Sequence, residues 1–190
     1  MKLKDDKKLD AIALATYRLV AERGLSALTL AAIAREAGIA TSTLYVYYAS
    51  KEALLNALYA RAKSATFERF VENDQPNTAL KPRIRQIWSN MLDNRGQHHA
   101  QVLFLEQCHG SQYMSEGNRE LGAGFAAFFH AILEQGQLAE ILKQVPLPFL
   151  VASITGSVKE TARLIGSHVV PDDAASRATS FLLCWDAIKA

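Results

Sequence analysis

Inward-facing side chains recur along most of the chain at intervals of three and four residues, the spacing of one face of an α-helix. The first such stripe ends at Gly24, where a helix C-cap needs the positive φ that glycine adopts without steric cost. Gly38 ends the next stripe, which follows a hydroxyl N-cap at Thr29, and a longer helix starts after Ser50. The positions that form these stripes are Ile12, Ala15, Thr16, Leu19, Val20, Leu30, Ile33, Ala34, Ala37, Leu54, Leu55 and Leu58.

The remaining sequence also has helical spacing, with no alternating pattern typical of a β-strand and no internal repeat. A polar, turn-rich segment that contains Pro76 predicts a loop at residues 73–77. Glycines and prolines separate the other predicted helices, which lie at about residues 41–48, 80–94, 99–109, 117–135, 148–166 and 172–188. The pattern therefore predicts an all-α fold of about nine helices, with a small N-terminal unit and a larger helical bundle.

The composition is that of an ordinary globular protein. Of the 190 residues, 49% are hydrophobic and 21% are charged, which argues against a disordered chain. No apolar run reaches the ~18–20 residues of a membrane span, and the charged amino terminus lacks the apolar stretch of a signal peptide. Two cysteines, Cys108 and Cys184, provide no disulfide framework. We therefore expect a cytoplasmic protein with no membrane partner.

Charge is unevenly distributed along the chain. Residues 1–63 hold ten Lys and Arg against six Asp and Glu, whereas residues 64–190 hold eleven against thirteen. A basic first third favours an anionic partner for this part of the chain. Chance variation on a solvated surface gives the same asymmetry. The charge distribution therefore indicates an anionic partner only if a binding motif is also present.

Residues 29–48 predict two short helices joined by a tight turn at Gly38. This is the spacing of a helix-turn-helix, whose second helix enters the major groove of DNA, although a corner between two helices of any bundle has the same spacing. The outward side chains of the second helix are short hydroxyls and aromatic rings, which can contact phosphates and base edges. Lys51 follows at the start of the next helix, where the free backbone N–H groups already favour a phosphate.

The segment from Gly24 to Leu55 adds further matches at fixed spacing and ends in TLYVYYASKEALL. It resembles the DNA-binding domain of the TetR family of transcriptional regulators. The sequence departs from the family pattern at Ala40, where a serine N-cap is frequent, and at Ser42, where glycine or alanine is common. The matching elements are Gly24, Thr29, Ile33-Ala34, Ala37-Gly38, Thr43-Leu44-Tyr45, Tyr47-Tyr48 and Ser50-Lys51-Glu52-Ala53-Leu54-Leu55.

The resemblance implies a ligand-responsive repressor with a helix-turn-helix DNA-binding domain at residues 1–50 and a helical ligand-binding and dimerisation domain at residues 51–190. Its implied partners are a double-stranded DNA operator, a small-molecule effector and a second copy of the chain, which makes a homodimer. The implied contacts divide into phosphate contacts (Thr43, Tyr47 and Lys51) and approaches to bases (Thr41, Ser42 and Tyr45). With the N-cap Thr29, the predicted DNA-binding residues are Thr29, Thr41, Ser42, Thr43, Tyr45, Tyr47 and Lys51.

Bulky apolar side chains gather in the middle helices, where the resemblance implies an effector cavity. Phe125 and Phe129 share one helical face, on a helix that several glycines make less rigid. Ordinary core packing is the alternative for each of these residues. The predicted ligand-binding residues are Trp88, Met91, Phe104, Cys108, His109, Phe125 and Phe129.

The last two predicted helices carry a candidate dimer interface. Small side chains on the first and an apolar stripe on the second would pack as a four-helix bundle with a second copy, and soluble monomers rarely expose such a stripe. The alternative is that Phe181 and Trp185 pack into the core of their own chain. The predicted interface residues are Ser153, Gly156, Ala178, Phe181, Leu182 and Trp185.

Motifs for catalysis or metal binding are not found in the sequence. It contains no CxxC, HExxH or phosphate-binding glycine loop, and the neighbours Cys108 and His109 diverge by about 100° on a helix. We therefore expect no metal, no cofactor and no enzymatic activity. The remaining alternative is a helical interaction protein without DNA binding, and salt-dependent retention on duplex DNA separates it from the DNA-binding hypothesis.

Overall fold

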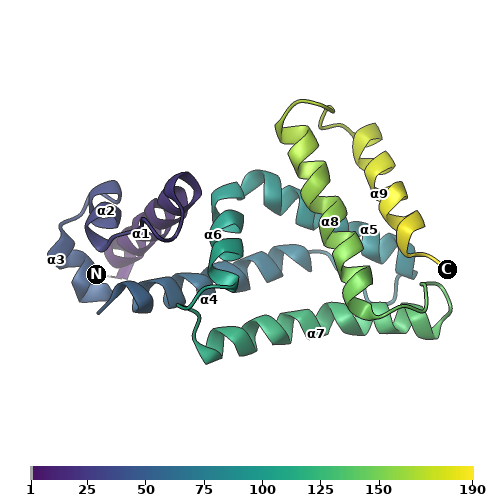
Figure 1. Cartoon of the computed structure of the whole chain (residues 1–190), viewed down its shortest axis with the longest axis horizontal. Coiled ribbons are helices and arrows are strands. Elements are labelled where there is room, and N and C mark those ends of the chain that lie inside the picture. Colours follow the sequence, from purple (N-terminus) through teal and green to yellow (C-terminus); the bar gives the residue numbers. More distant parts are fainter. Residues whose placement is uncertain (1) are drawn as a thin grey trace. The chain divides into compact units, whose positions relative to one another are not determined.

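The computed structural model describes residues 2–190, with side chains from Asp6 onward. Of the two predicted domains, only Met1 lies outside the described residues. Within this range the chain forms helices joined by short loops, without a β-strand, and the prediction of an all-α fold is confirmed (Figure 1). No helix in the described range is long and apolar enough to cross a membrane. The helices are α1 (Lys2–Arg23), α2 (Leu30–Glu36), α3 (Thr41–Tyr47), α4 (Lys51–Phe70), α5 (Leu80–Gln97), α6 (His99–His109), α7 (Glu116–Leu138), α8 (Leu147–Gly166) and α9 (Ala174–Ile188).

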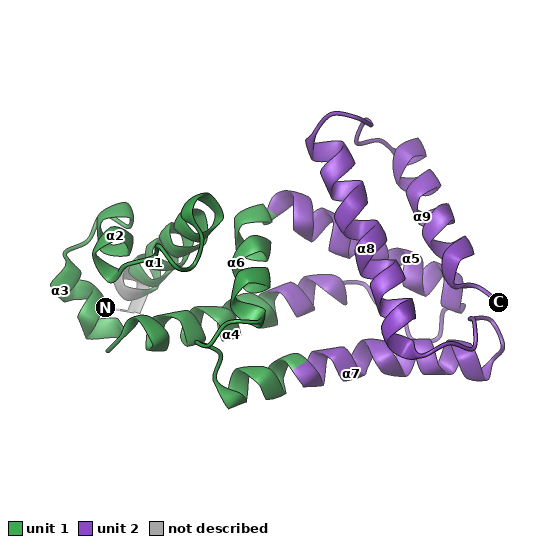
Figure 2. Ribbon diagram, viewed as in Figure 1, with its two compact units in different colours: residues 1–65, 98–122 green, residues 66–97, 123–190 purple. Residues whose placement is uncertain are grey.

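The chain forms two compact units, each built from two segments. Unit 1 comprises residues 1–65 and 98–122, and unit 2 comprises residues 66–97 and 123–190 (Figure 2). Helices α4 and α7 each contribute residues to both units. These packing units differ from the predicted domains at residues 1–50 and 51–190, because α6 packs with α1 rather than with its neighbours in sequence. The domain boundary stays a prediction.

Unit 1 is held together by contacts between α1 and α6. The rings of Tyr17 and Phe104 lie 5.0 Å apart between their centroids. Gln107 then closes the C-terminal end of α1: its Oε1 accepts the Leu25 backbone N–H at 2.8 Å, and its Nε2 donates to the Val20 carbonyl at 3.3 Å. The chain turns at Gly24 with φ +79°, the left-handed conformation predicted for a helix C-cap.

Unit 2 packs α5, α8 and α9 around a second apolar core. Trp88 of α5 is almost fully buried, and its indole N–H donates to the Ser157 hydroxyl of α8 at 2.8 Å, which satisfies the one polar atom of the ring. A buried ion pair fixes the loop before α5. Arg83 Nε donates to Asp74 Oδ1 and Arg83 Nη2 donates to Asp74 Oδ2, each at 2.8 Å. Bidentate pairing of this kind offsets part of the cost of burying the two charges.

The prediction that Phe181 and Trp185 form an exposed stripe on α9 is wrong. They are only 4% and 6% exposed, and they belong to the core of unit 2. Leu182 and Leu183, by contrast, are 50% and 67% exposed on the other side of the helix. Because α9 carries apolar residues on both sides, its spacing in the sequence does not reveal which side faces inward.

Gly136 lies inside α7 rather than at its end, where the sequence pattern placed it. A Cβ atom at this position would lie 2.5 Å from Leu80 Cδ2 and 2.6 Å from Leu142 Cδ1. Glycine is therefore required here because two leucine side chains pack directly against the helix backbone.

We expect Gly136→Ala to lower the free energy of unfolding by about 1–3 kcal/mol, since the added methyl group overpacks the contact with Leu80 and Leu142. Gly124 is a matched control on the same helix, because no atom lies within 4 Å of its Cβ position. Gly124→Ala should leave stability unchanged or raise it by about 0.5–1 kcal/mol, through helix propensity alone. Urea unfolding followed by circular dichroism measures both, and equal effects of the two substitutions would contradict this account.

Candidate nucleic-acid interface

Helices α2 and α3 form the predicted pair of short helices. The Thr29 hydroxyl accepts the Ala32 backbone N–H at 3.1 Å, which caps α2 as the sequence predicts. Gly38 adopts φ +68° and begins the turn into α3. Ile33 and Leu44 are fully buried between the helices, so these two apolar side chains set how α3 packs on α2.

The side of α3 opposite Leu44 is exposed. Thr41 and Ser42 lie in solvent at its first turn, and Tyr45 is 54% exposed. Val46 is the most exposed of the large hydrophobic residues on this helix, at 81%. The sequence pattern places Val46 outward, where its methyl groups can touch base edges and thymine methyls, but Val46 is not among the predicted DNA-binding residues.

The other predicted contact residues are only partly accessible. Thr43 and Tyr47 are half-buried, and Tyr47 packs against the core of unit 1. The first turn of α3 has no side-chain cap, since the N-cap residue is Ala40 and neither Thr41 nor Ser42 replaces the missing hydroxyl.

Lys51 is held by two partners within unit 1. Its Nζ donates to the Leu25 carbonyl at 3.2 Å and lies 5.2 Å from the centre of the Tyr113 ring. At the same helix end, the Ser50 hydroxyl accepts the Ala53 backbone N–H and caps α4. Lys51 thus joins the start of α4 to the α1–α2 loop and to the loop that follows α6.

Asn56 fixes this second loop on α4. Its Nδ2 donates to the Tyr113 carbonyl at 2.7 Å, and its Oδ1 accepts the Ser115 backbone N–H at 2.9 Å. The buried Asn118 donates to the same Oδ1, also at 2.9 Å. These bonds keep Tyr113 beside Lys51, so residues far along the chain determine where the predicted phosphate-binding cation lies.

Tyr48 is partly buried and packs against the core of unit 1. Burial raises the pKa of its phenol, and the nearby Arg61 guanidinium lowers it. Arg61 in turn pairs with Asp10, and this hydrogen bond raises the pKa of the guanidinium. At neutral pH, Tyr48 is therefore a neutral hydrogen-bonding group at the edge of the core.

Five phenylalanines form an aromatic cluster between α4 and α7 within unit 2. Phe67 and Phe125 stack in parallel with ring centroids 4.2 Å apart, while Phe128 and Phe129 meet Phe67 edge-on at 5.4 and 6.1 Å. Phe70 contacts Phe129 at 6.3 Å. All five are half-buried, so they present an aromatic surface that is not closed over by the rest of unit 2.

The seven predicted ligand-binding residues are divided between the two units. Phe104 and Cys108 fill the core of unit 1, where burial raises the pKa of the Cys108 thiol to about 12, and His109 is exposed nearby. Trp88 belongs to the core of unit 2 and Met91 packs at the edge of that core. Only Phe125 and Phe129 join the aromatic cluster. The sequence pattern identified large apolar residues but did not separate core from accessible positions.

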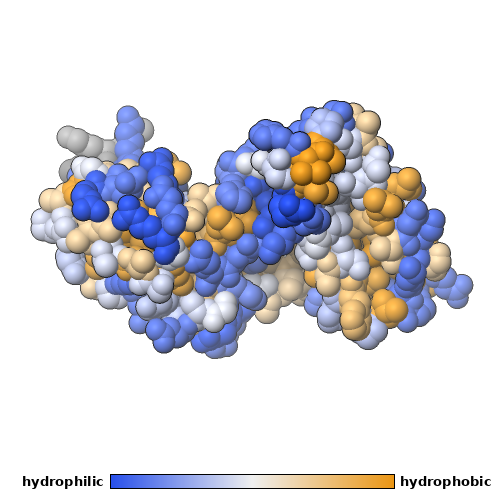
Figure 3. Space-filling model, turned by 45° about the horizontal axis from the view of Figure 1, so that its top comes forward, coloured by the Kyte–Doolittle hydropathy of each residue, from blue (hydrophilic) through white to orange (hydrophobic). Residues whose placement is uncertain are grey.

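The predicted dimer residues divide in a similar way. Gly156, Ala178 and Leu182 are exposed, and Ser153 is partly so, whereas Phe181 and Trp185 are buried in their own chain. Further apolar side chains lie exposed on the same two helices, and Figure 3 shows hydrophobic patches among hydrophilic surface on the face drawn there. The residues that the sequence reasoning missed are Phe149 on α8 and Leu183 on α9, each 67% exposed.

Metal ligands are not grouped in the described part of the chain. Over residues 6–190, whose side chains the structure describes, no three His, Cys, Asp or Glu side chains lie where they could hold a metal ion together. The expectations of no metal, no cofactor and no catalysis stay predictions.

A pair of short helices, with the first capped by Thr29 and the second exposed, is typical of a helix-turn-helix protein. The family model of bacterial regulatory proteins of the tetR family matches residues 12–58, and that of the tetracyclin repressor-like C-terminal domain matches residues 62–190. The chain therefore belongs to the TetR family of bacterial regulatory proteins, and the resemblance seen in the sequence is confirmed.

Individual relatives agree with this assignment. A TetR family transcription regulator from Marinobacter aquaeolei VT8 has the same fold, with a TM-score of 0.90 over 100% of this chain and 99% of that chain at 24% identity. The fatty acid metabolism regulator protein of Bacillus subtilis is 27% identical over 85% of this chain and 84% of its own length. The nucleoid occlusion factor SlmA of Pasteurella multocida is 30% identical over 46% of this chain, which spans only 44% of that relative.

Proposed function

We propose that this chain is a cytoplasmic transcriptional repressor that binds a near-palindromic DNA operator as a homodimer and releases it when a small apolar ligand binds. The proposal gives the chain no enzymatic role. The observation that carries the DNA-binding part is the exposed side of α3, on a helix-turn-helix within a family of bacterial regulators.

The exposed side chains of α3 match the chemistry of a major groove. Thr41 and Ser42 offer hydroxyls that donate to and accept from base edges, while the Tyr45 ring and the Val46 methyl groups suit thymine methyls. Seven residues of helix reach only a few base pairs. Two copies related by a twofold axis would place their helices about 34–36 Å apart, in successive major grooves on one face of the duplex.

Lys51 would supply a phosphate contact at the edge of this surface. In the structure its ammonium donates to a neutral acceptor, the Leu25 carbonyl. A phosphate oxygen is the stronger partner because its negative charge strengthens the hydrogen bond. The Tyr113 ring keeps the ammonium close to the helix-turn-helix in either case.

The aromatic cluster supports an effector that is mostly apolar. Phe125 and Phe129 are half-buried there, and half-buried Met91 lies elsewhere in the same unit. The name of the Bacillus subtilis relative refers to fatty acid metabolism, which is in keeping with an apolar ligand. We therefore assign the effector to Phe125 and Phe129 of the aromatic cluster, leave Trp88, Met91, Phe104 and Cys108 to the cores, and give the exposed His109 no ligand contact.

The exposed face of α8 and α9 supports the proposed dimer. Gly156 has no atom within 4 Å of its Cβ position, so its open surface would let another helix approach closely. Leu182, Leu183 and Phe149 are large apolar side chains on these two helices, and each is at least half exposed. Apolar side chains that gather on a surface are typical of an interface. With Ser153 and Ala178, these residues form the interface that we propose.

We expect Lys51→Ala and Tyr45→Ala to weaken DNA binding in different ways. Lys51→Ala should lower affinity for every duplex and reduce the slope of log affinity against log salt by about 1, since one phosphate contact is lost. Tyr45→Ala should cost the operator about 1–3 kcal/mol more than a random duplex. Fluorescence anisotropy over a salt series measures both, with Lys159→Ala on α8 as the charge-matched control.

Equal losses on operator and random duplex for both variants would rule out these two roles. If the unaltered protein shows no salt-dependent binding to any duplex, the helical interaction protein becomes the better account.

We expect Phe129→Leu to change the ligand concentration that releases the operator by about tenfold, because leucine removes an aromatic contact but keeps an apolar side chain. DNA affinity without ligand should stay within about twofold, since Phe129 lies outside the helix-turn-helix. Thermal-shift screening with apolar and cationic aromatic compounds supplies the ligands. The effector role fails if no compound both stabilises the protein and releases DNA.

We expect Leu182→Glu combined with Leu183→Glu to convert the dimer to monomers, since a twofold axis duplicates each charge in the interface. Both side chains are well exposed, so the fold should survive, as circular dichroism would verify. Leu138→Glu is the control, at an equally apolar position that is 85% exposed on α7. A double variant that sediments as an unchanged, folded dimer would exclude this interface.

A further inference from the structure

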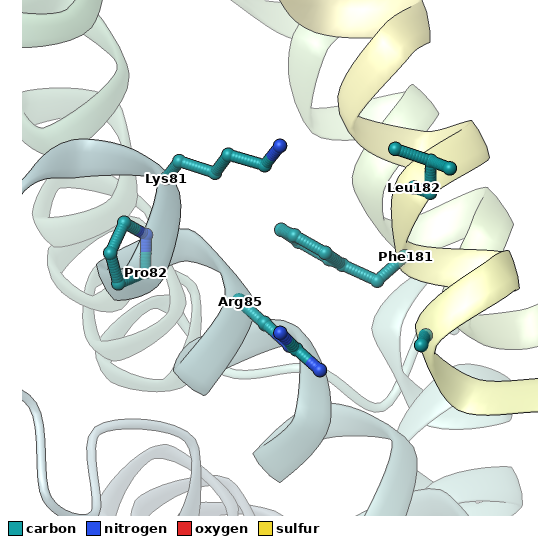
Figure 4. Close-up of a pocket in the computed structure, with 6 residues that line it drawn as sticks. Lys81, Pro82, Arg85, Phe181 and Leu182 are labelled. Carbon is teal, nitrogen blue, oxygen red and sulfur yellow. The ribbon is translucent and has the colours of Figure 1, made fainter. Parts of the chain in front are cut away.

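A groove lies on the outside of unit 2 between the first turns of α5 and the middle of α9, with a volume of ≈ 330 Å³. This volume is at the lower end of the range for small-molecule sites. The Phe181 ring extends from α9 toward α5, and Lys81 and Arg85 extend from α5 toward α9 (Figure 4). The lining residues are Lys81, Pro82, Arg85, Ala178, Phe181 and Leu182.

The two cations of the groove lie over aromatic rings. The Lys81 ammonium is 5.5 Å from the centre of the Trp185 ring, and the Arg85 guanidinium is 5.9 Å from that of Phe181. No acidic side chain lines the groove. Asp186, whose carboxylate feels the charge of Lys81, is already paired with Lys189 at 2.7 Å. The ring contacts hold the cations in place but do not neutralise them.

The position of these cations is electrostatically unfavourable for α5. The helix begins with Lys81, Arg83 and Arg85 and has no acidic residue in its first turn, although the positive end of the helix dipole favours acids there. Asp74 neutralises Arg83 through a buried bidentate pair. Lys81 and Arg85 are four residues apart, so they also repel each other on one face of the helix. Asp186 compensates the charge of Lys81 only in part, because its carboxylate is paired with Lys189. A local conflict of this kind is typical of a functional site.

We propose that this groove binds a small amphipathic carboxylate. The carboxylate lies between Lys81 and Arg85, where it accepts a bidentate pair of hydrogen bonds from the guanidinium and relieves the repulsion between the two cations. The alkyl or aromatic body lies mainly on Leu182, which is 50% exposed, and touches only the edge of Phe181, which is 4% exposed. None of these residues belongs to the phenylalanine cluster to which we assign the effector, so this is a second ligand site.

A second copy of the chain is the competing occupant, because Ala178 and Leu182 also belong to the proposed dimer face. One acidic side chain would satisfy the two cations but would fill only part of the ≈ 330 Å³. A free carboxylate with an apolar body matches both the charge and the volume of the groove. The carboxylate is therefore the occupant that the observations favour.

The test uses octanoate as the probe, octanamide as its uncharged counterpart and inorganic sulfate as an anion without an apolar body. Trp88 and Trp185 are the two tryptophans of the chain, and both rings contact or adjoin the Phe181 ring, so intrinsic fluorescence reports on the groove. We expect saturable binding of octanoate, with octanamide and sulfate at least about tenfold weaker, because each lacks one of the two contacts.

Substitutions of the two exposed cations, Lys81 and Arg85, test whether octanoate binds in the groove. Lys81→Gln and Arg85→Gln should each weaken octanoate binding by about three- to tenfold, and the double variant should lose the fluorescence response. Lys159→Gln, which removes an exposed charge from α8, should leave binding unchanged within about twofold. All these positions are exposed, so unfolding does not confound the comparison.

Three outcomes would overturn the proposal: octanamide binding as tightly as octanoate, the double variant binding octanoate like the unaltered protein, or octanoate binding to monomers alone in sedimentation experiments. The second outcome would place octanoate elsewhere, and the third would show that a second copy fills the groove. None of these measurements contains DNA, so failure here is distinct from failure of the proposed repressor function.

Discussion

Helix α1 needs an apolar partner that its neighbours in sequence are too short to provide. It has 22 residues, whereas α2 and α3 have seven each. Helix α6 supplies the missing surface through Phe104, and Gln107 satisfies peptide groups where α1 ends. The rest of unit 1 depends on this contact, because it fixes the helix from which the helix-turn-helix starts.

The loop that follows α6 is linked to the start of α4, directly after the exposed helix α3. Asn56 binds the loop at Tyr113, and Tyr113 lies against Lys51. Neutral amides make most of these bonds, and the Asn56 side chain both donates and accepts, so no buried charge is needed to hold the loop. The geometry around the proposed phosphate contact is thus set by hydrogen bonds rather than by ion pairs.

The features that could be predicted from the sequence are those determined by neighbouring residues. Gly24 and Thr29 mark a helix end and a helix start through backbone conformation and capping, and both act as expected. The features that could not be predicted depend on residues distant in the chain. Phe181 and Leu182 are adjacent and similarly apolar, yet one is buried and the other exposed, because only the packing of α5 and α8 decides which side of α9 faces inward.

The pairing of α1 with α6 has a consequence for how the chain is made. During synthesis α1 and the helix-turn-helix leave the ribosome before α6, because Phe104 and Gln107 follow about eighty residues after the end of α1. Until they emerge, the inward face of α1 lacks its cover, and apolar surface in a nascent chain is prone to aggregate or to bind chaperones. The packing of the helix-turn-helix unit is therefore completed only once a helix distant in the sequence has been translated.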